Sequence, residues 1–270
     1  MTERVGTQPQ GAAASLLNGL AVLEAFTTAH PVLGVTEISD RVGLHKSTVS
    51  RMLNGLAEAG YVQRDEGSGR FRLGLGLLGL AAPLLAELDV RRAALPHLED
   101  LTARTSETSA ISLWNGNEAV VIEQVASPHQ VKHSAHIGTR YTRWASSSVR
   151  LFLSTLDMGT VEQLVTSGSI EVTEQDRIDG GYADAAAHLA LIREEGLAVN
   201  DGQTTYEEYG VSAAIRDYRG RIAGCITVSA PRSRVQHLDL GDELAEATKD
   251  AARAVSARLG LQNGNGDNVA

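Results

Sequence analysis

The chain has 270 residues, a hydrophobic fraction of 43% and a formal net charge of −9 at pH 7. This length is typical of two domains, and the apolar content is sufficient for buried cores. The single cysteine, Cys225, excludes an intrachain disulfide and zinc-finger spacing, and in its apolar run it is expected to be a buried thiol. The longest apolar stretch, residues 73–86, is too short and too rich in glycine for a bilayer span, which needs roughly 20 apolar residues. Residues 1–10 are polar, unlike a signal peptide, so a cytoplasmic location without membrane contact is expected.

The net negative charge comes entirely from the C-terminal part of the chain. Residues 1–75 carry seven Lys and Arg and seven Asp and Glu, whereas residues 76–270 carry 17 and 26. An acidic part of this kind is not expected to hold nucleic acid. Any contact with DNA therefore belongs to the neutral N-terminal part, with its cations on one side and a dimer to raise the affinity.

The first predicted elements form a helix-turn-helix. A polar tail, residues 1–14, precedes a helix that begins near Ser15. Thr36 is positioned to cap a second, short helix, and Gly43 to end it. A third helix is predicted to begin near Lys46 or Ser47, because apolar residues follow at the spacing i, i+3, i+4, i+7. These apolar residues are Val49, Met52, Leu53 and Leu56.

The opposite face of this third helix is polar. It carries Lys46, Ser47, Thr48, Ser50, Arg51 and Asn54. Short hydroxyl and amide groups beside cations are suited to base edges and phosphate oxygens, and the helix N-terminus favours a phosphate. The alternative is a plain amphipathic hairpin of helices with its polar face in water.

A β-hairpin is predicted directly after this helix. Residues 61–64 and 70–73 alternate like strands, and residues 65–69 have turn chemistry. A helix-turn-helix followed by a hairpin is a winged helix, here over residues 15–74. Arg64, Arg70 and Arg72 would lie on the wing beside the phosphate backbone. For each of them the alternative is a solvated hairpin face.

The remaining elements predict an α+β domain. A Leu- and Ala-rich linker helix, residues 75–89, leads to a domain over residues 90–260, and a polar tail covers residues 261–270. Strands are predicted at 109–114, 119–125, 131–137, 197–201, 211–217 and 221–230, and helices at 94–105, 146–156, 159–167, 182–195 and 239–259. Hairpin turns join neighbouring strands, as at Asn115-Gly116. This favours an antiparallel sheet flanked by helices, with a pocket on one side.

Several segments together resemble the IclR family of bacterial transcriptional regulators. They are the winged helix, Phe71-Arg-Leu-Gly74, residues 95–108 and residues 229–235. The resemblance covers about 15–260 and depends on the order and spacing of the segments. It implies a winged helix-turn-helix joined to a GAF-like effector domain, in dimers or tetramers that bind palindromic operators and respond to small organic acids. Residues 47, 48, 50 and 51 match the positions that face DNA in this family.

The resemblance also implies an effector pocket built from three stretches. The implied residues are Ala145, Ser146, Ser147 and Ser148 at a helix start, Asn200, Asp201 and Ala213 in the second stretch, and Thr227 and Ser229 on one strand. Hydroxyl and N–H groups at a helix start are suited to a carboxylate. The alternatives are helix capping for the serines and ordinary strand positions for residues 227 and 229. Whether residue 200 or residue 201 faces the pocket is left open.

The chain departs from the usual family pattern near this pocket. Thr142, Val149, Arg150 and Ala213 stand where the family usually has Pro, Gly, Lys and Cys. The ligand is therefore expected to differ from those of the best-known members. The rings of Tyr141, Trp144, Tyr206 and Tyr209 gather near the pocket in sequence, which favours an aromatic acid or a related amide. The alternative for these rings is core or lid packing.

His129, His133 and His136 are candidate metal ligands by residue type. On a strand over residues 131–137, His133 and His136 would point to opposite faces, so they do not converge with His129. No metal and no cofactor are expected.

The function expected is that of a ligand-responsive repressor that binds an operator. The alternative is an enzyme built on the C-terminal α+β domain, but no nucleophile elbow, P-loop, zinc-protease motif or paired carboxylates are found. A pure interaction module would leave Ser47, Arg51 and the wing arginines without a role.

Overall fold

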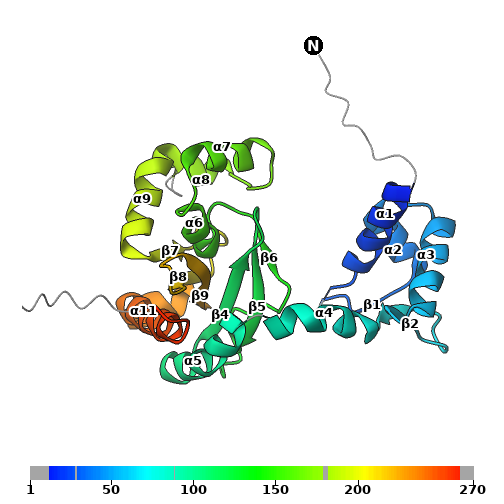
Figure 1. The fold of residues 1–270 in the computed structure, drawn as a ribbon, viewed down its shortest axis with the longest axis horizontal. Coiled ribbons are helices and arrows are strands. Elements are labelled where there is room, and N and C mark those ends of the chain that lie inside the picture. Colours follow the sequence, from blue (N-terminus) through cyan, green and yellow to red (C-terminus); the bar gives the residue numbers. More distant parts are fainter. Residues whose placement is uncertain (1–11, 28, 88, 179–181, 262–270) are drawn as a thin grey trace, which may run out of the picture. The chain divides into compact units, whose positions relative to one another are not determined.

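The computed structural model describes residues 12–27, 29–87, 89–178 and 182–261. The chain divides after Glu87 into two compact units (Figure 1). Each unit is described here by itself. Most of the two predicted polar tails lies outside the described residues.

The N-terminal unit is a three-helix bundle with a small sheet. Its elements are α1 (Ala12–Glu24), β1 (Val32–Leu33), α2 (Val35–Val42), α3 (Lys46–Glu58), β2 (Val62–Arg64), β3 (Phe71–Leu73) and α4 (Gly76–Glu87). The sheet is antiparallel with the order β1-β3-β2, so the predicted hairpin is confirmed and gains a third strand. Val22, Ile38, Val49 and Leu53 are fully buried and join the three helices.

Local capping explains where α2 and α3 begin. The prediction that Thr36 caps α2 was wrong: Gly34 is the cap, and its N–H donates to the Glu37 carboxylate at 2.7 Å. A carboxylate three residues beyond the cap completes a capping arrangement that Thr36, already inside the helix, could not make. Gly43 ends α2 with φ +68°, as predicted. His45 caps α3, because its Nδ1 accepts from the Ser47 N–H at 3.3 Å.

The connection from the hairpin to α4 depends on close backbone contact. The Gly74 N–H donates to the Tyr61 carbonyl and the Gly76 N–H to the Gly60 carbonyl, at 2.8 and 3.1 Å. A Cβ at residue 74 would lie 2.3 Å from the Gly60 oxygen. Only glycine fits there, and this fixes the point at which α4 begins.

The C-terminal unit has one six-stranded antiparallel sheet with the order β6-β5-β4-β9-β8-β7. Its strands are β4 (Thr108–Trp114), β5 (Ala119–Val125), β6 (Arg140–Tyr141), β7 (Leu197–Asp201), β8 (Glu208–Arg216) and β9 (Ile222–Pro231). Its helices are α5 (Asp89–Thr105), α6 (Ser147–Leu153), α7 (Met158–Thr166), α8 (Glu174–Ile178), α9 (Ala185–Glu195), α10 (Arg232–Leu238) and α11 (Gly241–Arg258), with a 3₁₀ turn over Tyr182–Asp184. The predicted α+β class with an antiparallel sheet flanked by helices is confirmed.

The two faces of the sheet are covered by different helices (Figure 1). Ile111, Ile226 and Val228 pack against α5 and α11 on one face. Alternate residues of the same strands point to the other face, where Cys225 packs with α6 and α9. Cys225 is fully buried, as predicted, and burial raises the pKa of its thiol to about 12. Farther along that second face the strand residues are polar and small, and there the sheet leaves room for a cavity.

Several elements of the C-terminal unit differ from the prediction. Residues 131–137 do not form a strand, and the partner of β5 is instead β6. Val131 and Ile137 are 71% and 60% exposed, so two of the apolar side chains that suggested a strand do not pack against the protein core. The helices α8 and α10 were not predicted. They have only five and seven residues, which is too short for a clear period of apolar positions.

Within the described part of the chain, no helix is both long and apolar enough to cross a membrane.

Candidate functional site: a polar recognition helix and a polar cavity

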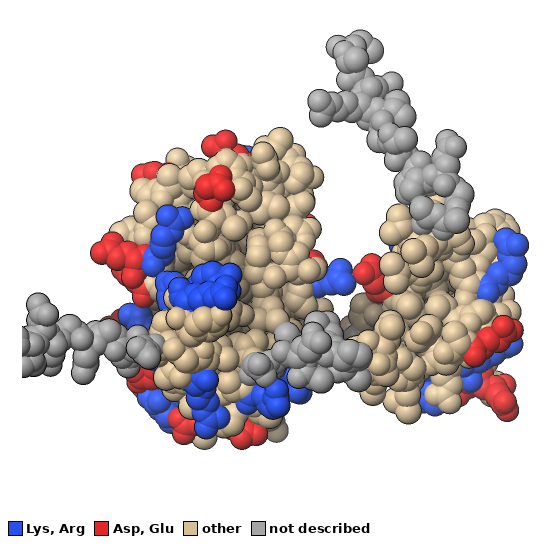
Figure 2. All heavy atoms as spheres, in the orientation of Figure 1, with Lys and Arg blue, Asp and Glu red and all other residues tan. Residues whose placement is uncertain are grey.

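Helix α3 turns a polar face to solvent. The side of Val49 and Leu53 is fully buried, whereas Lys46, Arg51 and Asn54 are exposed. Ser47 is also exposed, and Thr48 and Ser50 are half-buried on the shoulders. Figure 2 shows Lys and Arg side chains on the outer side of α3. The helix therefore presents an uninterrupted polar ridge outside the core.

His45, which the sequence reasoning missed, belongs to this ridge. It is exposed, and its Nδ1 lies 2.7 Å from the Ser47 hydroxyl as well as near the Ser47 N–H. The ring therefore orders the first turn of α3, and it uses part of the hydrogen-bonding capacity of Ser47. Its position directly before a predicted helix start was the available signal.

The wing arginines have different surroundings. Arg70 donates to the Glu37 carboxylate at 2.7 Å and to the Val32 carbonyl at 3.1 Å, which ties the hairpin to α2. The backbone N–H of Gly34, followed by the Arg70 hydrogen bond, lowers the pKa of Glu37. Arg64 lies over the Phe71 ring and Arg72 donates to Gln63 across the hairpin, and both are exposed. Arg64 and Arg72 thus offer accessible cations, while Arg70 already braces the base of the wing.

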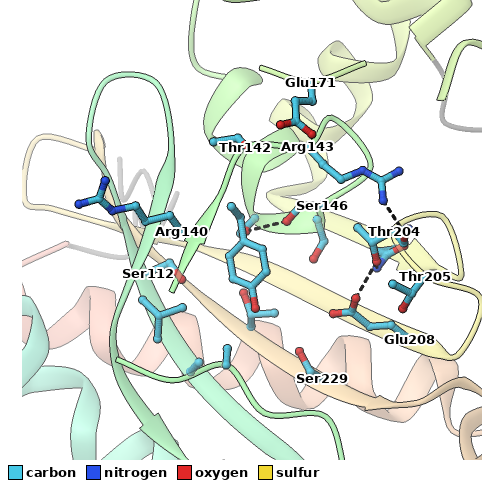
Figure 3. A pocket seen from close by; sticks show the side chains of 18 residues that line it. Ser112, Arg140, Thr142, Arg143, Ser146, Glu171, Thr204, Thr205, Glu208 and Ser229 are labelled. Carbon is cyan, nitrogen blue, oxygen red and sulfur yellow. Dashed lines mark hydrogen bonds between the residues drawn. The ribbon is translucent and has the colours of Figure 1, made fainter. Parts of the chain in front are cut away.

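A cavity of about 380 Å³ lies on the polar part of the second sheet face in the C-terminal unit (Figure 3). Seven residues named from the sequence line it: Tyr141, Ser146, Ser147, Ser148, Asn200, Thr227 and Ser229. The other lining residues are Ala110, Ser112, Val121, Ala135, Arg140, Thr142, Arg143, Glu171, Thr204, Thr205 and Glu208. The wall thus combines strands β4, β5, β8 and β9, the start of α6 and the loop after β7.

Hydroxyl groups form a connected row along one wall of the cavity. The Ser147 hydroxyl lies 2.8 Å from that of Ser212, which in turn lies 2.7 Å from that of Thr227. A second pair, Ser146 and Ser148, is 3.0 Å apart. All three serines at the start of α6 are buried, so these hydroxyls are shielded from bulk water and oriented by one another.

An amide and a carboxylate form another part of the wall, next to the serines. The buried Asn200 amide donates to the Thr204 hydroxyl, which donates to the Glu208 carboxylate, each at 2.6 Å. The Oδ1 of the Asn200 side chain accepts the Thr204 N–H, so the loop after β7 is fastened to the strand end. Burial, and then the charge of Glu208, raises the pKa of the Tyr141 phenol to about 12. That hydroxyl is therefore a neutral donor at physiological pH.

Arg143 and Glu171 lie at the upper part of the cavity in Figure 3, whereas the Arg140 side chain extends to the left, away from them. Arg143 donates through Nη1 to the Thr204 carbonyl at 2.6 Å, and its Nη2 lies 3.9 Å from Asp176. Its Nε is buried and has no hydrogen-bond partner among the residues that the structure describes. A buried guanidinium N–H without an acceptor is costly, so this position is suited to an acceptor brought by a ligand or by water.

Arg150 holds three parts of the cavity wall together from behind. Its Nη2 donates to the Ala145 carbonyl at 3.0 Å, to the Val199 carbonyl at 2.6 Å and to the Gln203 amide oxygen at 2.8 Å. The side chain is 1% exposed, and burial lowers its pKa to about 10. Arg150 was noted from the sequence only as a departure from the family pattern.

Four residues named for the pocket do not line it. Trp144 is fully buried against Tyr182 at a ring distance of 5.0 Å, and Ala145 contributes its carbonyl to Arg150. Ala213 points to the opposite sheet face, in the α5–α11 core. Asp201 follows Asn200 on β7 and so points away from it, to an exposed ion pair with Arg232 at 2.6 Å.

The expected gathering of aromatic rings around the pocket was therefore wrong for three of the four. Tyr206 is 74% exposed and lies over Arg232, while Tyr209 is buried in the α5–α11 core. Only Tyr141 lines the cavity. The side of a strand or loop on which a ring falls is set by packing that the local sequence does not record.

The charged residues of the cavity were missed from the sequence. Arg140 and Arg143 come from one segment, and Glu171 and Glu208 from two others that are distant in sequence from it and from each other. Each resembles an ordinary surface residue in its own segment. Among the described residues no cluster of three potential metal ligands occurs, and His133 instead contacts the Glu207 carbonyl at 3.1 Å.

A winged helix with a polar, solvent-facing third helix, followed by an α+β unit with a polar cavity, defines the class of small-molecule-responsive transcriptional regulators. The chain belongs to the IclR family. Residues 15–66 match the IclR helix-turn-helix domain, and residues 82–257 match the bacterial transcriptional regulator IclR C-terminal domain. The family expectation drawn from the sequence is thereby confirmed.

Relatives of known name agree with this assignment. The chain is 29% identical over 257 residues to the HTH-type transcriptional repressor AllR of Salmonella typhimurium, covering 94% of this chain and 92% of the relative. It is 27% identical over 258 residues to the HTH-type transcriptional regulator KipR of Bacillus subtilis, covering 91% and 97%. An IclR homologue from Microbacterium hydrocarbonoxydans, solved with 4-hydroxybenzoate, shares the fold with a TM-score of 0.76 at 23% identity, over 91% of this chain and 98% of that one. The protein is a transcriptional regulator. The alternative of an enzyme built on the C-terminal domain is not supported by these relatives.

Proposed function

We propose that the protein is a cytoplasmic, non-enzymatic repressor that binds a palindromic operator as a dimer or tetramer and releases it when a small organic acid fills the cavity. The observation that carries the DNA-binding part is the exposed polar ridge of α3 above a fully buried Val49 and Leu53. A helix presented in this way by a winged helix fits the major groove. Residues 46, 47, 48, 50, 51 and 54 are proposed to contact DNA, with Arg64, Arg70 and Arg72 at the phosphates.

Exposed leucines support the assembly of more than one subunit. Leu16 and Leu20 on α1 are 68% and 50% exposed, and Leu75 and Leu78 at the start of α4 are 82% and 62% exposed. Large apolar side chains exposed in this number on a small unit favour a protein partner, here a second copy. A second copy would also place two reading helices on two half-sites about 34 Å apart. Sedimentation of the full chain as a monomer at micromolar concentration would contradict this part.

Arg51 provides the test of DNA binding. Arg51→Ala is expected to weaken binding to the promoter of the gene itself and to random DNA by similar factors, because an exposed guanidinium supplies a phosphate contact. The slope of log affinity against log salt should become shallower by about 1. Fluorescence anisotropy with labelled duplexes measures both quantities. Arg253→Ala, which removes an exposed arginine from α11, is the matched control and should bind as the parent does.

The effector class follows from the cavity. The buried Arg143 Nε has no partner among the described residues and supports an acceptor such as a carboxylate oxygen at that position, although Glu171 and Glu208 also line the cavity. The row of hydroxyls and the Asn200–Thr204–Glu208 wall offer partners for further polar groups of the same molecule. A volume of about 380 Å³ is at the small end of ligand pockets, which supports a small acid. The 4-hydroxybenzoate of the related structure makes aromatic acids a natural first class to screen.

A thermal-shift screen of small carboxylates, 4-hydroxybenzoate included, against the full chain tests this part. Thr227→Val and Ser229→Ala are expected to lower the response to any acid that binds, because each removes a hydroxyl from the cavity wall. Both variants should keep the parent's affinity for DNA. Ser233→Ala removes an exposed hydroxyl outside the cavity and serves as the control. If both cavity variants bound the acid with the parent's affinity, the effector site would have to lie outside this cavity.

A further inference from the structure

A second cavity of about 410 Å³ lies at the other end of α6, where the effector cavity does not reach. Its lining includes Arg193, Arg216 and Arg221 beside Leu151, Ile192 and Ile222. These residues come from the C-terminal end of α6, the end of α9 and the β8–β9 hairpin. No residue is shared with the first cavity.

The charge of this cavity is opposite to that of the chain around it. Three of its lining residues are arginines, and none of those described as lining it is acidic. Residues 76–270 carry 26 Asp and Glu against 17 Lys and Arg. Figure 2 shows Lys and Arg side chains gathered over the β8–β9 part of the sheet on the face in view. Like charges placed around one hollow repel each other, so the arrangement favours a bound anion.

Each of the three guanidinium groups is held in place by part of its hydrogen-bonding capacity. Arg193 donates to the Ser154 and Leu156 carbonyls, and Arg216 donates through Nη1 to the Gly220 carbonyl. Arg221 pairs with Asp217, the one acid that contacts this group among the described residues. A guanidinium has five N–H donors, so each retains donors beyond these bonds. Because the groups are already ordered, a ligand loses less free energy in immobilising them.

We propose that this arginine cavity, defined by residues 193, 216 and 221, is a second small-molecule site that binds a multivalent oxyanion. A single carboxylate would neutralise one arginine, whereas a phosphate ester or a polycarboxylate can accept hydrogen bonds from all three. Planar guanidinium groups suit such oxygens, because two parallel N–H groups match two oxygens. The volume leaves room for an organic part beyond one phosphate.

Isothermal titration of the full chain with pyrophosphate, with citrate and with acetate tests the proposal. Saturable binding of pyrophosphate or citrate, with acetate at least tenfold weaker, is expected, and the stronger of the two identifies phosphate or carboxylate as the preferred chemistry. Arg216→Gln and Arg221→Gln should each weaken binding about tenfold or more, because each removes charge-assisted hydrogen bonds. Arg193 also binds carbonyls at the end of α6, so Arg221, which is 67% exposed in its side chain, is the variant least at risk of misfolding.

Arg219→Gln is the matched control. Its side chain lies over the Tyr218 ring at the tip of the same hairpin, outside the cavity, and it removes the same charge. Binding of pyrophosphate by this variant should equal that of the parent. The proposal is overturned if neither multivalent anion binds saturably, if acetate binds equally well, or if Arg219→Gln loses as much affinity as the cavity variants. Unchanged binding in Arg216→Gln and Arg221→Gln would also overturn it, since the anion would then occupy another site.

Discussion

Replacing Arg150 by Met tests how the cavity beside the start of α6 is held together. Arg150 is 1% exposed and is the common donor to the Ala145 carbonyl, the Val199 carbonyl and the Gln203 side chain. Methionine has a similar length but no donor, so the start of α6, strand β7 and the loop after it lose their shared anchor. The two backbone carbonyls would remain buried without this partner.

The expected loss of stability follows from these contacts. A hydrogen bond to a charged group contributes about 1.5–3 kcal/mol, so two buried carbonyls correspond to about 3–6 kcal/mol. Burial lowers the pKa of Arg150 to about 10, which means that the folded protein holds this charge at a cost. Removing the charge recovers part of that cost. We therefore expect the free energy of unfolding to fall by about 3 kcal/mol, the lower end of the range.

Urea unfolding at pH 7, followed by tryptophan fluorescence, measures this change. Both tryptophans, Trp114 and Trp144, lie in the C-terminal unit, so the signal reports on the part of the chain that contains Arg150. Arg150→Lys is the matched control: it keeps the charge but not the planar fork, and about half of the loss is expected. A Met variant as stable as the parent to within about 0.5 kcal/mol, or a Lys variant as unstable as the Met variant, would refute this reasoning.

Three further predictions concern single positions. Gly74→Ala should destabilise the N-terminal unit by about 2 kcal/mol or more in thermal unfolding, because the new Cβ would lie 2.3 Å from a carbonyl oxygen; a variant as stable as the parent would contradict this. Asn200→Ala should weaken the effector response in thermal shift, whereas Asp201→Ala should not. Equal effects of the two substitutions would contradict the assignment of Asn200, and not Asp201, to the cavity wall. The Cys225 thiol, with its pKa raised from 9.0 to about 12, is protonated in the folded state while the unfolded chain ionises near pH 9. The contribution of Cys225 to the free energy of unfolding is complete below pH 9. It is lost as the pH rises toward 12, by about 1.4 kcal/mol per pH unit. The free energy of unfolding of Cys225→Ala should therefore depend less on pH between pH 9 and 10.5.

Local patterns in the sequence were sufficient for the helices and hairpin of the winged helix and for the longer strands of the C-terminal sheet. The period of apolar residues in 49–56 separated the buried side of α3 from its polar ridge, and Gly43 marked the end of α2 by its positive φ. The turn at Asn115-Gly116 set the β4–β5 hairpin, and alternation put Thr227 on the same face as Ser229. These features depend on residues within one or two turns of each other, so their physical cause is contained in a short window.

Only the tertiary structure decided which residues surround the cavity proposed to bind the effector. Trp144 turned into the core, Asp201 turned to solvent and residues 131–137 stayed irregular, because each outcome depends on surfaces supplied by distant segments. The Arg143 and Glu208 side chains reach the cavity from segments 65 residues apart in the sequence, and neither segment alone contains a sign of the other. Periodicity assigns a residue to a face of its own element, whereas a cavity wall exists only once several faces have packed together.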